Sequence, residues 1–475
     1  MPYATVNPYT NELVKSFPDA TDEEVDAVLD RAQEAYRSWS RVPVAERCAI
    51  FTKASQLVLE RKEELARLAT LEMGKLYGES LGEVQDNAAS MLAYFAENAE
   101  GMLRPKSLEN AYPDQEVMML YQPQGIVFSI EPWNVPYYQA IRAFAPNAIA
   151  GNVVILKHAS IVPQCAAAIV QVLHDAGLPE GVWQNVYATH EQVERIIADP
   201  RVRGITLTGS AEAGSKIAAQ AGKARHKTVL ELGGADPFVI LPDADLDFTV
   251  ACAVPARFWI GGQVCISGKR MIVVDPLYDE FLERYTTSLS PLHPGDPFDP
   301  TTTFAPLSSQ AQADIVKAQI AKAVAGGATA TEVGDPIPPT GAFVQPTILT
   351  NVAKENPIFH EEIFGPVPMI FRVPDVEAAV ELANDSPYGL AGSVWGRDIA
   401  RAVEVAKRID TGMVSINQPY SGPNALPFGG VKNSGYGREM GYEGMHEFLN
   451  HKPITLPAGT STRYGATTEE AVVVG

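Results

Sequence analysis

The sequence is poor in cysteine, poor in basic residues relative to acidic ones, and free of long apolar runs. Its 475 residues include four cysteines, at positions 48, 165, 252 and 265, without the paired spacing of a zinc site. This usage is typical of a reducing compartment, and it predicts four free thiols, no disulfide framework and no metal centre. Lys and Arg number 37 against 57 Asp and Glu, so the formal net charge is −20. A nucleic-acid partner is not expected, because phosphate neutralisation requires clustered cations.

No apolar run reaches the roughly 20 residues that cross a bilayer, and no basic segment followed by an apolar one opens the chain. We therefore expect a cytoplasmic protein that makes no membrane contact. At 475 residues the chain exceeds what one hydrophobic core usually serves, so two or more domains are expected.

Short apolar runs that alternate with amphipathic segments predict an α/β fold. The first hundred residues are predicted to be mostly helical, with one helix beginning at Asp22 behind Thr21 as its N-cap and helical spacing from Val44 to Leu71. Beyond them, buried parallel strands are expected at 125–130, 153–156 and 204–207, with helices at 162–176 and 190–198. Such βαβ units build a doubly wound parallel sheet, whose ligand crevice lies at the carboxyl ends of the strands. A second α/β set is expected near 271–274, 310–325 and 376–383, with a glycine pair at 233–234 marking the crossing.

One cysteine stands in a context that suits a reactive thiol. The stretch Phe258-Trp-Ile-Gly-Gly-Gln-Val-Cys-Ile-Ser-Gly-Lys-Arg270 places Cys265 after two glycines and before a basic pair. A thiol attacks only as a thiolate, so a reactive cysteine needs backbone N–H groups or cations nearby, and glycines let the backbone approach the sulfur. Cys265 is therefore the candidate nucleophile. The alternative is a buried cysteine that packs as a small hydrophobe.

Two stretches upstream of this cysteine complete a pattern: Pro132-Trp-Asn-Val-Pro136 and Glu231-Leu-Gly-Gly234. Together with Gly-Gln-Val-Cys265 they resemble the aldehyde dehydrogenase superfamily, and three further segments stand in the same order. These are Thr208-Gly-Ser210 with Gly214, Glu362-Ile-Phe-Gly-Pro366, and Pro427-Phe-Gly-Gly430 with Ser434. The resemblance runs from Val6 to about Lys452. The local sequence Leu-Lys157-His-Ala-Ser160 is most similar to the succinate-semialdehyde dehydrogenase branch.

The resemblance implies how the chain is divided. Residues 1–105 and 123–231 would form the dinucleotide-binding domain, with its doubly wound parallel sheet, and residues 232–440 an α/β catalytic domain. Residues 106–122 and 441–460 would form a small β oligomerisation extension whose strands pair across subunits in a homodimer or homotetramer. Residues 461–475 would be a tail.

The resemblance also implies a reaction and the residues that perform it. Cys265 would attack the carbonyl of a small aldehyde, and the Asn134 side-chain amide would stabilise the resulting oxyanion together with the Cys265 backbone N–H. Glu231 would activate the water that hydrolyses the thioester, and its apolar flanks predict a raised pKa. Its presence argues against the CoA-acylating relatives, which generally lack this base. The alternative for Asn134 is a structural residue in a proline-flanked turn.

A nicotinamide dinucleotide is the expected cofactor. Gly209, Ser210 and Gly214 follow a strand and open a helix, which suits a pyrophosphate, although Ser210 alone is equally explained as an N-cap. The resemblance places four further side chains around the cofactor: Trp133 near the pyrophosphate, Lys157 at the adenosine ribose, and Glu362 with Phe364 at the nicotinamide half.

The choice between NADP and NAD depends on Ser160. Many relatives that use NAD carry a glutamate three residues after Lys157, which repels a 2′-phosphate, whereas a serine there can donate a hydrogen bond to it. NADP is therefore the expected preference, with NAD as the alternative. The competing interpretation is that Ser160 caps the next helix and has no part in this choice.

Substrate recognition departs from the family pattern in several places. Arg142 matches an arginine that grips the substrate carboxylate, the alternative being a helix-face residue in a surface salt bridge, and Ser421 stands one place off the usual carboxylate-binding serine. Ile260 replaces the usual asparagine, so a more apolar pocket is expected. Ile266 and Ser267 replace a second cysteine, so no disulfide switch is expected.

The function expected is oxidation of succinate semialdehyde to succinate through a cysteine thiohemiacetal and thioester. The alternatives are oxidation of another aliphatic or aromatic aldehyde, or a non-catalytic scaffold.

Overall fold

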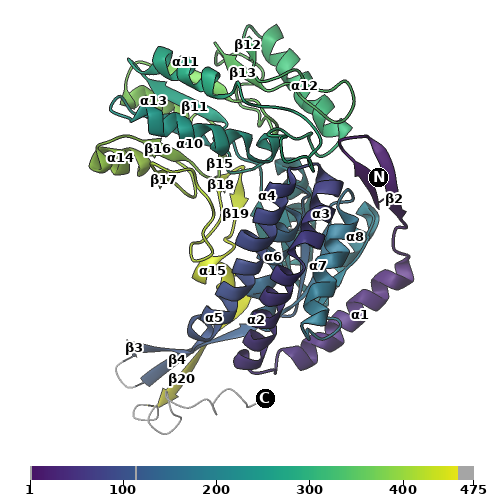
Figure 1. The fold of residues 1–475 in the computed structure, drawn as a ribbon. Coiled ribbons are helices and arrows are strands. Elements are labelled where there is room, and N and C mark those ends of the chain that lie inside the picture. Colours follow the sequence, from purple (N-terminus) through teal and green to yellow (C-terminus); the bar gives the residue numbers. More distant parts are fainter. Residues whose placement is uncertain (1–2, 113–114, 458–475) are drawn as a thin grey trace.

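The computed structural model describes residues 3–112 and 115–457, and it divides them between two α/β units and a β arm. Figure 1 shows the two units one above the other, with the arm extending from the lower one. The expected fold class is thus confirmed. Residues 461–475, predicted to be a tail, lie outside the described residues.

A six-stranded sheet forms the centre of the lower unit, in the order β19-β9-β8-β5-β6-β7. Every neighbouring pair is parallel except β19 with β9. The parallel strands are mostly buried, as expected for strands covered on both faces, whereas β19 is a short edge strand. They are β5 (Ile126–Glu131), β6 (Val153–His158), β7 (Trp183–Asn185), β8 (Val202–Thr208), β9 (Lys227–Glu231) and β19 (Gly435–Tyr436).

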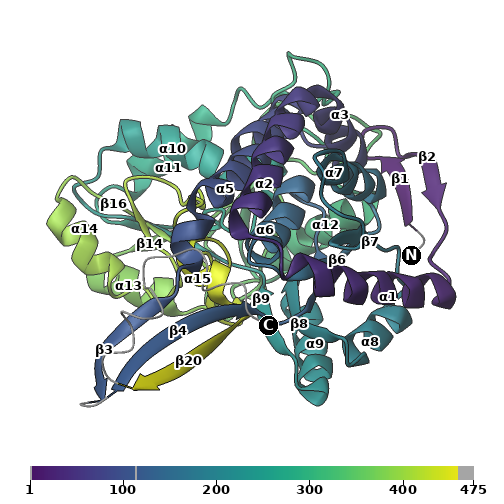
Figure 2. The same ribbon diagram turned by 90° about the horizontal axis from the view of Figure 1, so that it is seen from below.

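Helices cover both faces of this sheet, which makes it doubly wound (Figure 2). The helices α6 (Pro136–Ile149) and α7 (Pro163–Asp175) lie on one face, and α1 (Asp22–Trp39), α8 (His190–Ala198) and α9 (Ala211–Ala224) on the other. A further layer packs behind α6 and α7: α2 (Val44–Glu60), α3 (Lys62–Met73), α4 (Tyr77–Gly82), the π-helical η1 (Glu83–Ala89) and α5 (Ser90–Leu103). The hairpin of β1 (Tyr3–Asn7) and β2 (Glu12–Phe17) precedes them.

Local sequence signals account for the helix boundaries in this unit. Thr21 caps α1 in a capping box with Glu24, as the sequence predicts. The apolar pattern from 44 to 71 is two helices, because the chain leaves helical geometry at Arg61, which has φ −99° and ψ 14°. Only the structure reveals that break, since neither glycine nor proline marks it.

The upper unit is built on a seven-stranded sheet in the order β12-β13-β14-β11-β10-β16-β17. Its strands are β10 (Pro237–Ile240), β11 (Arg270–Val274), β12 (Thr329–Glu332), β13 (Thr347–Thr350), β14 (Met369–Val373), β16 (Ser393–Trp395) and β17 (Ser415–Ile416). One core lies between this sheet and α10 (Leu246–Phe258) with α11 (Tyr278–Ser288). A second core lies against α12 (Gln310–Ala325), α13 (Val376–Asn384) and α14 (Ile399–Ala406).

The arm is an antiparallel sheet of β3 (Lys106–Tyr112), β4 (Gln115–Pro123) and β20 (Leu449–Pro457), in the order β20-β4-β3. The helix α15 (Gly441–His446) precedes β20 and packs against α6 of the lower unit, so the arm strand itself begins at Leu449. A small ladder of β15 (Tyr388–Gly389) and β18 (Val431–Lys432) connects the returning chain to the upper unit.

The two units are joined by the short segment 232–236, which contains the glycine pair and links β9 to β10. A Cβ on Gly234 would lie 2.8 Å from the Cys265 carbonyl oxygen, so the close approach of these two backbone segments favours glycine here. The crossing therefore places the end of the lower sheet beside the loop that carries Cys265. No helix in the described ranges is long and apolar enough to cross a membrane.

Candidate active site

Four polar side chains end neighbouring strands of the lower sheet in a single row. The register pairs His158 with Glu131 across β6 and β5, and Thr208 with Glu231 across β8 and β9. Because β5 and β8 are also parallel, with Ile130 opposite Leu207, all four side chains lie at the carboxyl edge and on the same face. This is the edge at which doubly wound sheets bind their ligands.

The segment that carries Cys265 enters this edge from the upper unit through a strained turn. After α10 the backbone passes through the left-handed region at Ile260, with φ 53°, and at the two glycines that follow. A β-branched residue rarely adopts this conformation, and it persists only where the surroundings fix it. They do so here, because the Ile260 N–H donates to Glu79 at 2.8 Å and the Gln263 side chain donates to the Ile260 carbonyl at 3.1 Å. Cys265 is thereby presented on a rigid loop.

Asn134 is held against this loop in a geometry suited to an oxyanion. Its side-chain Nδ2 donates to the Gln263 carbonyl at 3.0 Å, and its Oδ1 accepts from Gln139 at 3.3 Å. A carboxamide has two N–H groups, so one remains available. The Cys265 N–H has no acceptor among the residues that the structure describes. Asn134 therefore bridges two distant segments instead of closing its own turn, and it offers a donor beside the Cys265 amide.

The Cys265 thiol is protonated in this resting arrangement. Burial is the main reason that the pKa of the thiol is raised to about 11. Asp236 and Glu362 also raise this pKa, whereas Arg142 and Lys269 lower it. The sequence pattern predicted cations near the sulfur, and they are present, but desolvation outweighs them. All four cysteines are free thiols, as expected.

Glu231 is a buried carboxyl group, with 1% of its surface exposed and neither oxygen hydrogen-bonded to a described residue. Burial is the main reason that its pKa is well above the usual range, and the neighbouring Glu439 raises it further, while Arg142 and Arg438 oppose the shift. The apolar flanks of Glu231 predict this behaviour. A carboxylate with a raised pKa is a stronger base than an exposed one.

Arg142 is buried, with 1% exposed, not at the surface, and its charge acts on both Glu231 and Cys265. It forms an ion pair with Glu439 at 2.5 Å and donates to the Thr208 hydroxyl at 2.9 Å. Burial alone would lower its pKa, but Glu439 and other acidic neighbours raise the pKa above its ordinary value. Arg142 does form a salt bridge, but the alternative that placed this salt bridge at the surface is wrong. A substrate role for Arg142 stays a prediction, and Ser421 is exposed in the loop after β17.

The residues predicted to bind the cofactor come from both units. Ser210 is the N-cap of α9, its hydroxyl accepting from the Ala213 N–H at 3.2 Å, and the missing Cβ of Gly214 leaves room for Leu232. Gly209 donates its N–H to the Glu231 carbonyl at 2.9 Å. The Trp133 and Phe364 rings meet edge to face, 5.7 Å apart, across the boundary between the units.

Two residues, Lys157 and Ser160, are predicted to lie at the adenosine end of the cofactor. Lys157 is partly buried at the end of β6, which lowers its pKa, and no carboxylate in the described ranges pairs with it. Ser160 does not cap the following helix, because α7 begins at Pro163 with Val162 in the N-cap position. The interpretation of Ser160 as a cap is therefore wrong, and its hydroxyl is left for another partner.

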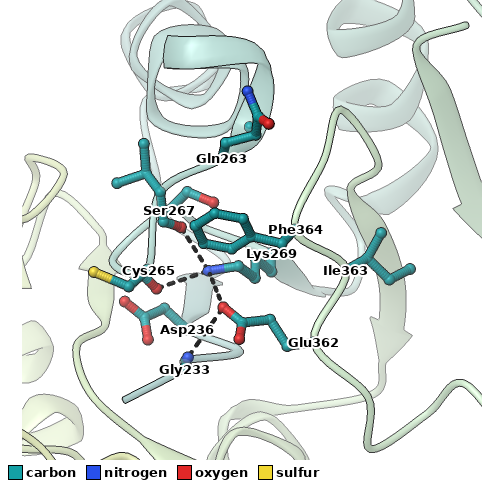
Figure 3. Close-up of polar contacts among 12 residues, drawn as sticks. Gly233, Asp236, Gln263, Cys265, Ser267, Lys269, Glu362, Ile363 and Phe364 are labelled. Atoms are coloured by element: carbon teal, nitrogen blue, oxygen red, sulfur yellow. Dashed lines mark hydrogen bonds and ion pairs between the residues drawn. The ribbon is translucent and has the colours of Figure 1, made fainter. Parts of the chain in front are cut away.

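Figure 3 shows a second ion pair close to Cys265, between the buried Lys269 and the partly buried Glu362. Glu362 accepts the Gly234 N–H at 3.1 Å and pairs with Lys269 at 3.2 Å. The sequence pattern did not assign Lys269 or Glu439 a role. Lys269 belongs to the basic pair after the cysteine, and that pair could have indicated a cation near the sulfur. Nothing in the sequence around Glu439 indicates that it pairs with Arg142.

Known proteins match this chain over almost its whole length. Residues 1–454 match the aldehyde dehydrogenase family. A succinate-semialdehyde dehydrogenase [NADP(+)] of Deinococcus radiodurans is 49% identical over 95% of this chain and 94% of its own, and one of Mycobacterium avium is 41% identical over 97% and 98%. A crystal structure of succinic semialdehyde dehydrogenase from Streptococcus pyogenes with NADP+ superposes with a TM-score of 0.93, at 42% identity, over 96% of this chain and 100% of that one. The chain belongs to the aldehyde dehydrogenase family.

Proposed function

We propose that this protein is an NADP-dependent succinate-semialdehyde dehydrogenase. The observation that carries the proposal is that Asn134 donates to the Gln263 carbonyl of the Cys265 loop, while Arg142 donates to Thr208, the strand partner of Glu231. Nucleophile, base and the Asn134 amide therefore share one site at the carboxyl edge of the lower sheet. The names of the relatives agree with this chemistry.

The reaction follows from the positions of these groups. The Cys265 thiol first loses its proton to water, and the thiolate attacks the aldehyde carbon. The oxygen that becomes negative accepts hydrogen bonds from Asn134 and the Cys265 N–H. When bound, NADP supplies the acceptor for the hydride that leaves this carbon. Glu231 then takes a proton from water as the water attacks the thioester carbon, which releases the acid and the cysteine sulfur. A raised pKa suits Glu231 to accepting that proton and returning it.

The preference for NADP over NAD is supported by the groups near the adenosine end. The Lys157 ammonium has no carboxylate partner among the described residues, and Ser160 offers a hydroxyl in place of a repelling glutamate. Both groups can donate hydrogen bonds to a phosphate oxygen. The relatives from Deinococcus radiodurans and Mycobacterium avium are named for NADP, and the Streptococcus pyogenes enzyme was solved with NADP+ bound.

The substrate carboxylate would be held by Arg142, as predicted from the sequence. One of its terminal nitrogens, Nη1, is buried and unpaired among the described residues, so the guanidinium can bind a second acceptor while Glu439 keeps the first. Ser421 would contribute from the exposed loop after β17.

The β arm would complete a homodimer or homotetramer by pairing with a second copy. Its outer strand β3 pairs with β4 on one side only, and an unpaired strand edge is a ready surface for another strand. The four free thiols fit a cytoplasmic location.

The proposal is tested by mixing the protein with NADP+ and succinate semialdehyde and following the reduced cofactor at millisecond resolution. A burst followed by steady turnover is expected, and Cys265→Ser should show neither while still binding NADP+. A non-catalytic scaffold would give no burst with wild type. Faster turnover of a neutral aliphatic or aromatic aldehyde would overturn the substrate while leaving the chemistry in place.

A further inference from the structure

Lys269 is a fully buried cation directly behind the nucleophile. Its side chain is 0% exposed, and its ammonium group donates to the Val264 and Cys265 carbonyl oxygens, each at 2.7 Å. The third neighbour is the Glu362 carboxylate, at 3.2 Å. Figure 3 shows the ammonium between the cysteine loop and the Glu362 loop, with Asp236 on the same side. An ammonium group has three N–H donors, and the two carbonyls accept from two of them, while Glu362 lies within ion-pair distance.

The two carbonyls belong to the peptide groups on either side of Cys265. The Val264 carbonyl shares its peptide group with the Cys265 N–H, which is the backbone donor expected to face the oxyanion. A hydrogen bond from a cation to the carbonyl oxygen polarises the peptide group and makes its N–H a stronger donor. The same bond fixes the direction of that N–H, and direction decides how well a donor stabilises a developing charge.

The ion pair with Glu362 joins this peptide group to the cofactor side of the site. Glu362 also accepts the Gly234 N–H from the segment that connects the two sheets. A single buried contact network therefore runs from the interdomain crossing through Glu362 and Lys269 to the cysteine peptide groups.

We propose that Lys269 is a positioning residue that orients and polarises the Val264–Cys265 peptide group, so that the Cys265 N–H stabilises the oxyanion formed on the aldehyde. The proposal rests on the proposed function, since it assigns a part of the same reaction. Lys269 touches neither the aldehyde nor the sulfur in this assignment. It acts through the peptide group, and its charge is kept in the interior by Glu362.

The competing interpretation is an ion pair that only stabilises the fold. Replacing the lysine by a neutral side chain of similar length separates the two interpretations, because methionine fills the space but cannot donate. Lys269→Arg keeps the charge and the donors. If packing alone mattered, methionine would be tolerated at least as well as the larger arginine; if donation matters, arginine should retain more activity.

The experiment compares wild type, K269M, K269R and the control K322M in the NADPH burst with succinate semialdehyde. Lys322 pairs with Glu361, one residue before Glu362, but that pair is partly exposed and lies outside the site. Alkylation of Cys265 by iodoacetamide is measured across pH in parallel, because it uses the same sulfur and forms no oxyanion. Its profile reports the thiolate fraction, which depends on Arg142, Asp236 and Glu362 as well as on Lys269.

For K269M the burst rate, corrected for the thiolate fraction, should fall by about tenfold or more, less than the roughly 10²–10³ seen when an oxyanion donor is removed outright. K269R should recover most of this loss, and K322M should match wild type. A corrected burst rate for K269M within twofold of wild type would overturn the inference, as would K269R performing no better than K269M. If K269M does not fold, the comparison of K269R with wild type decides, because loss of the burst in a folded K269R would also count against it. If wild type gives no burst with any aldehyde, it is the proposed function that fails.

Discussion

Glu439→Gln tests whether the buried ion pair with Arg142 controls the pKa of Glu231, the proposed catalytic base. The pair is deeply buried, with side chains 1% and 6% exposed, and the Glu439 carboxylate also accepts from Thr206 at 2.6 Å. Glutamine keeps the size and the acceptor for Thr206 but removes the charge. The change therefore isolates electrostatics from packing.

The direction of the effect on Glu231 follows from the charges around it. Its pKa is raised first by burial and then by Glu439, and it is lowered by Arg142. Removing the Glu439 charge deletes a term that raises the pKa and leaves Arg142 unpaired, so the pKa of Glu231 should fall. A unit charge several ångströms away at an effective dielectric constant near 20 is worth about 2–3 kcal/mol. The acidic limb of the deacylation rate should therefore move to lower pH.

The stability of the variant should depend on pH in the same sense. Breaking a buried ion pair by removing one partner costs roughly 3–5 kcal/mol of unfolding free energy, and a glutamine that keeps its hydrogen bonds belongs at the lower end. At low pH, Glu231 is neutral and Arg142 stays unpaired, so the loss is greatest there. As the pH rises, ionisation of Glu231 supplies a new partner and the loss becomes smaller.

The measurements are steady-state rates from pH 5 to 10 and urea unfolding at both ends of that range, with Glu443→Gln as control. Glu443 is exposed on α15, four residues after Glu439, so its loss should shift neither quantity. An unchanged acidic limb in Glu439→Gln would refute the coupling to Glu231. Unfolding free energy within about 1 kcal/mol of wild type at low pH would refute the importance of the buried pair.

Three further outcomes are expected. Glu231→Gln should allow one burst of NADPH but slow the steady state, because only deacylation needs the base; steady turnover without a burst would contradict this. Ser160→Glu should lower kcat/KM for NADP+ by at least tenfold, about 1.4 kcal/mol, with a much smaller effect for NAD+, and an unchanged ratio would remove Ser160 from cofactor choice. Arg142→Ala should raise KM far more for succinate semialdehyde than for a neutral aldehyde of equal length, by roughly 1.5–3 kcal/mol, whereas equal losses would make Arg142 structural.

Local signals predicted the elements whose ends are marked in the sequence. The helices at 190–198 and 310–325 begin behind Thr189 and Ser309, whose side chains cap them, and both ranges agree with the structure. The break at Arg61 carries no such mark. It depends on how α2 and α3 pack against neighbouring helices, which a single sequence does not encode locally.

The site residues show the same division between local and long-range information. Short motifs identified Cys265, Glu231 and Asn134, and the fold brings them to one edge of the sheet. The partner of Arg142 could not be predicted, because Glu439 lies at the far end of the chain and reaches α6 only after the last strands have returned to the lower sheet. The pKa of the Cys265 thiol was equally beyond the sequence, since it depends on how completely the folded loop removes the sulfur from water.

Cys265 therefore lies between two buried cation–carboxylate pairs, Arg142 with Glu439 and Lys269 with Glu362. Burial is the largest influence on the Cys265 thiol and raises its pKa to about 11; Arg142 and Lys269 lower the pKa, and Asp236 and Glu362 raise it. Any ligand that draws a carboxylate away from its cation leaves net positive charge beside the sulfur and lowers that pKa. Glu362 is the carboxylate that the family resemblance places at the nicotinamide half of the cofactor. A thiol that ionises only when the cofactor is in place would be protected from oxidation in its absence, because oxidants react with the thiolate.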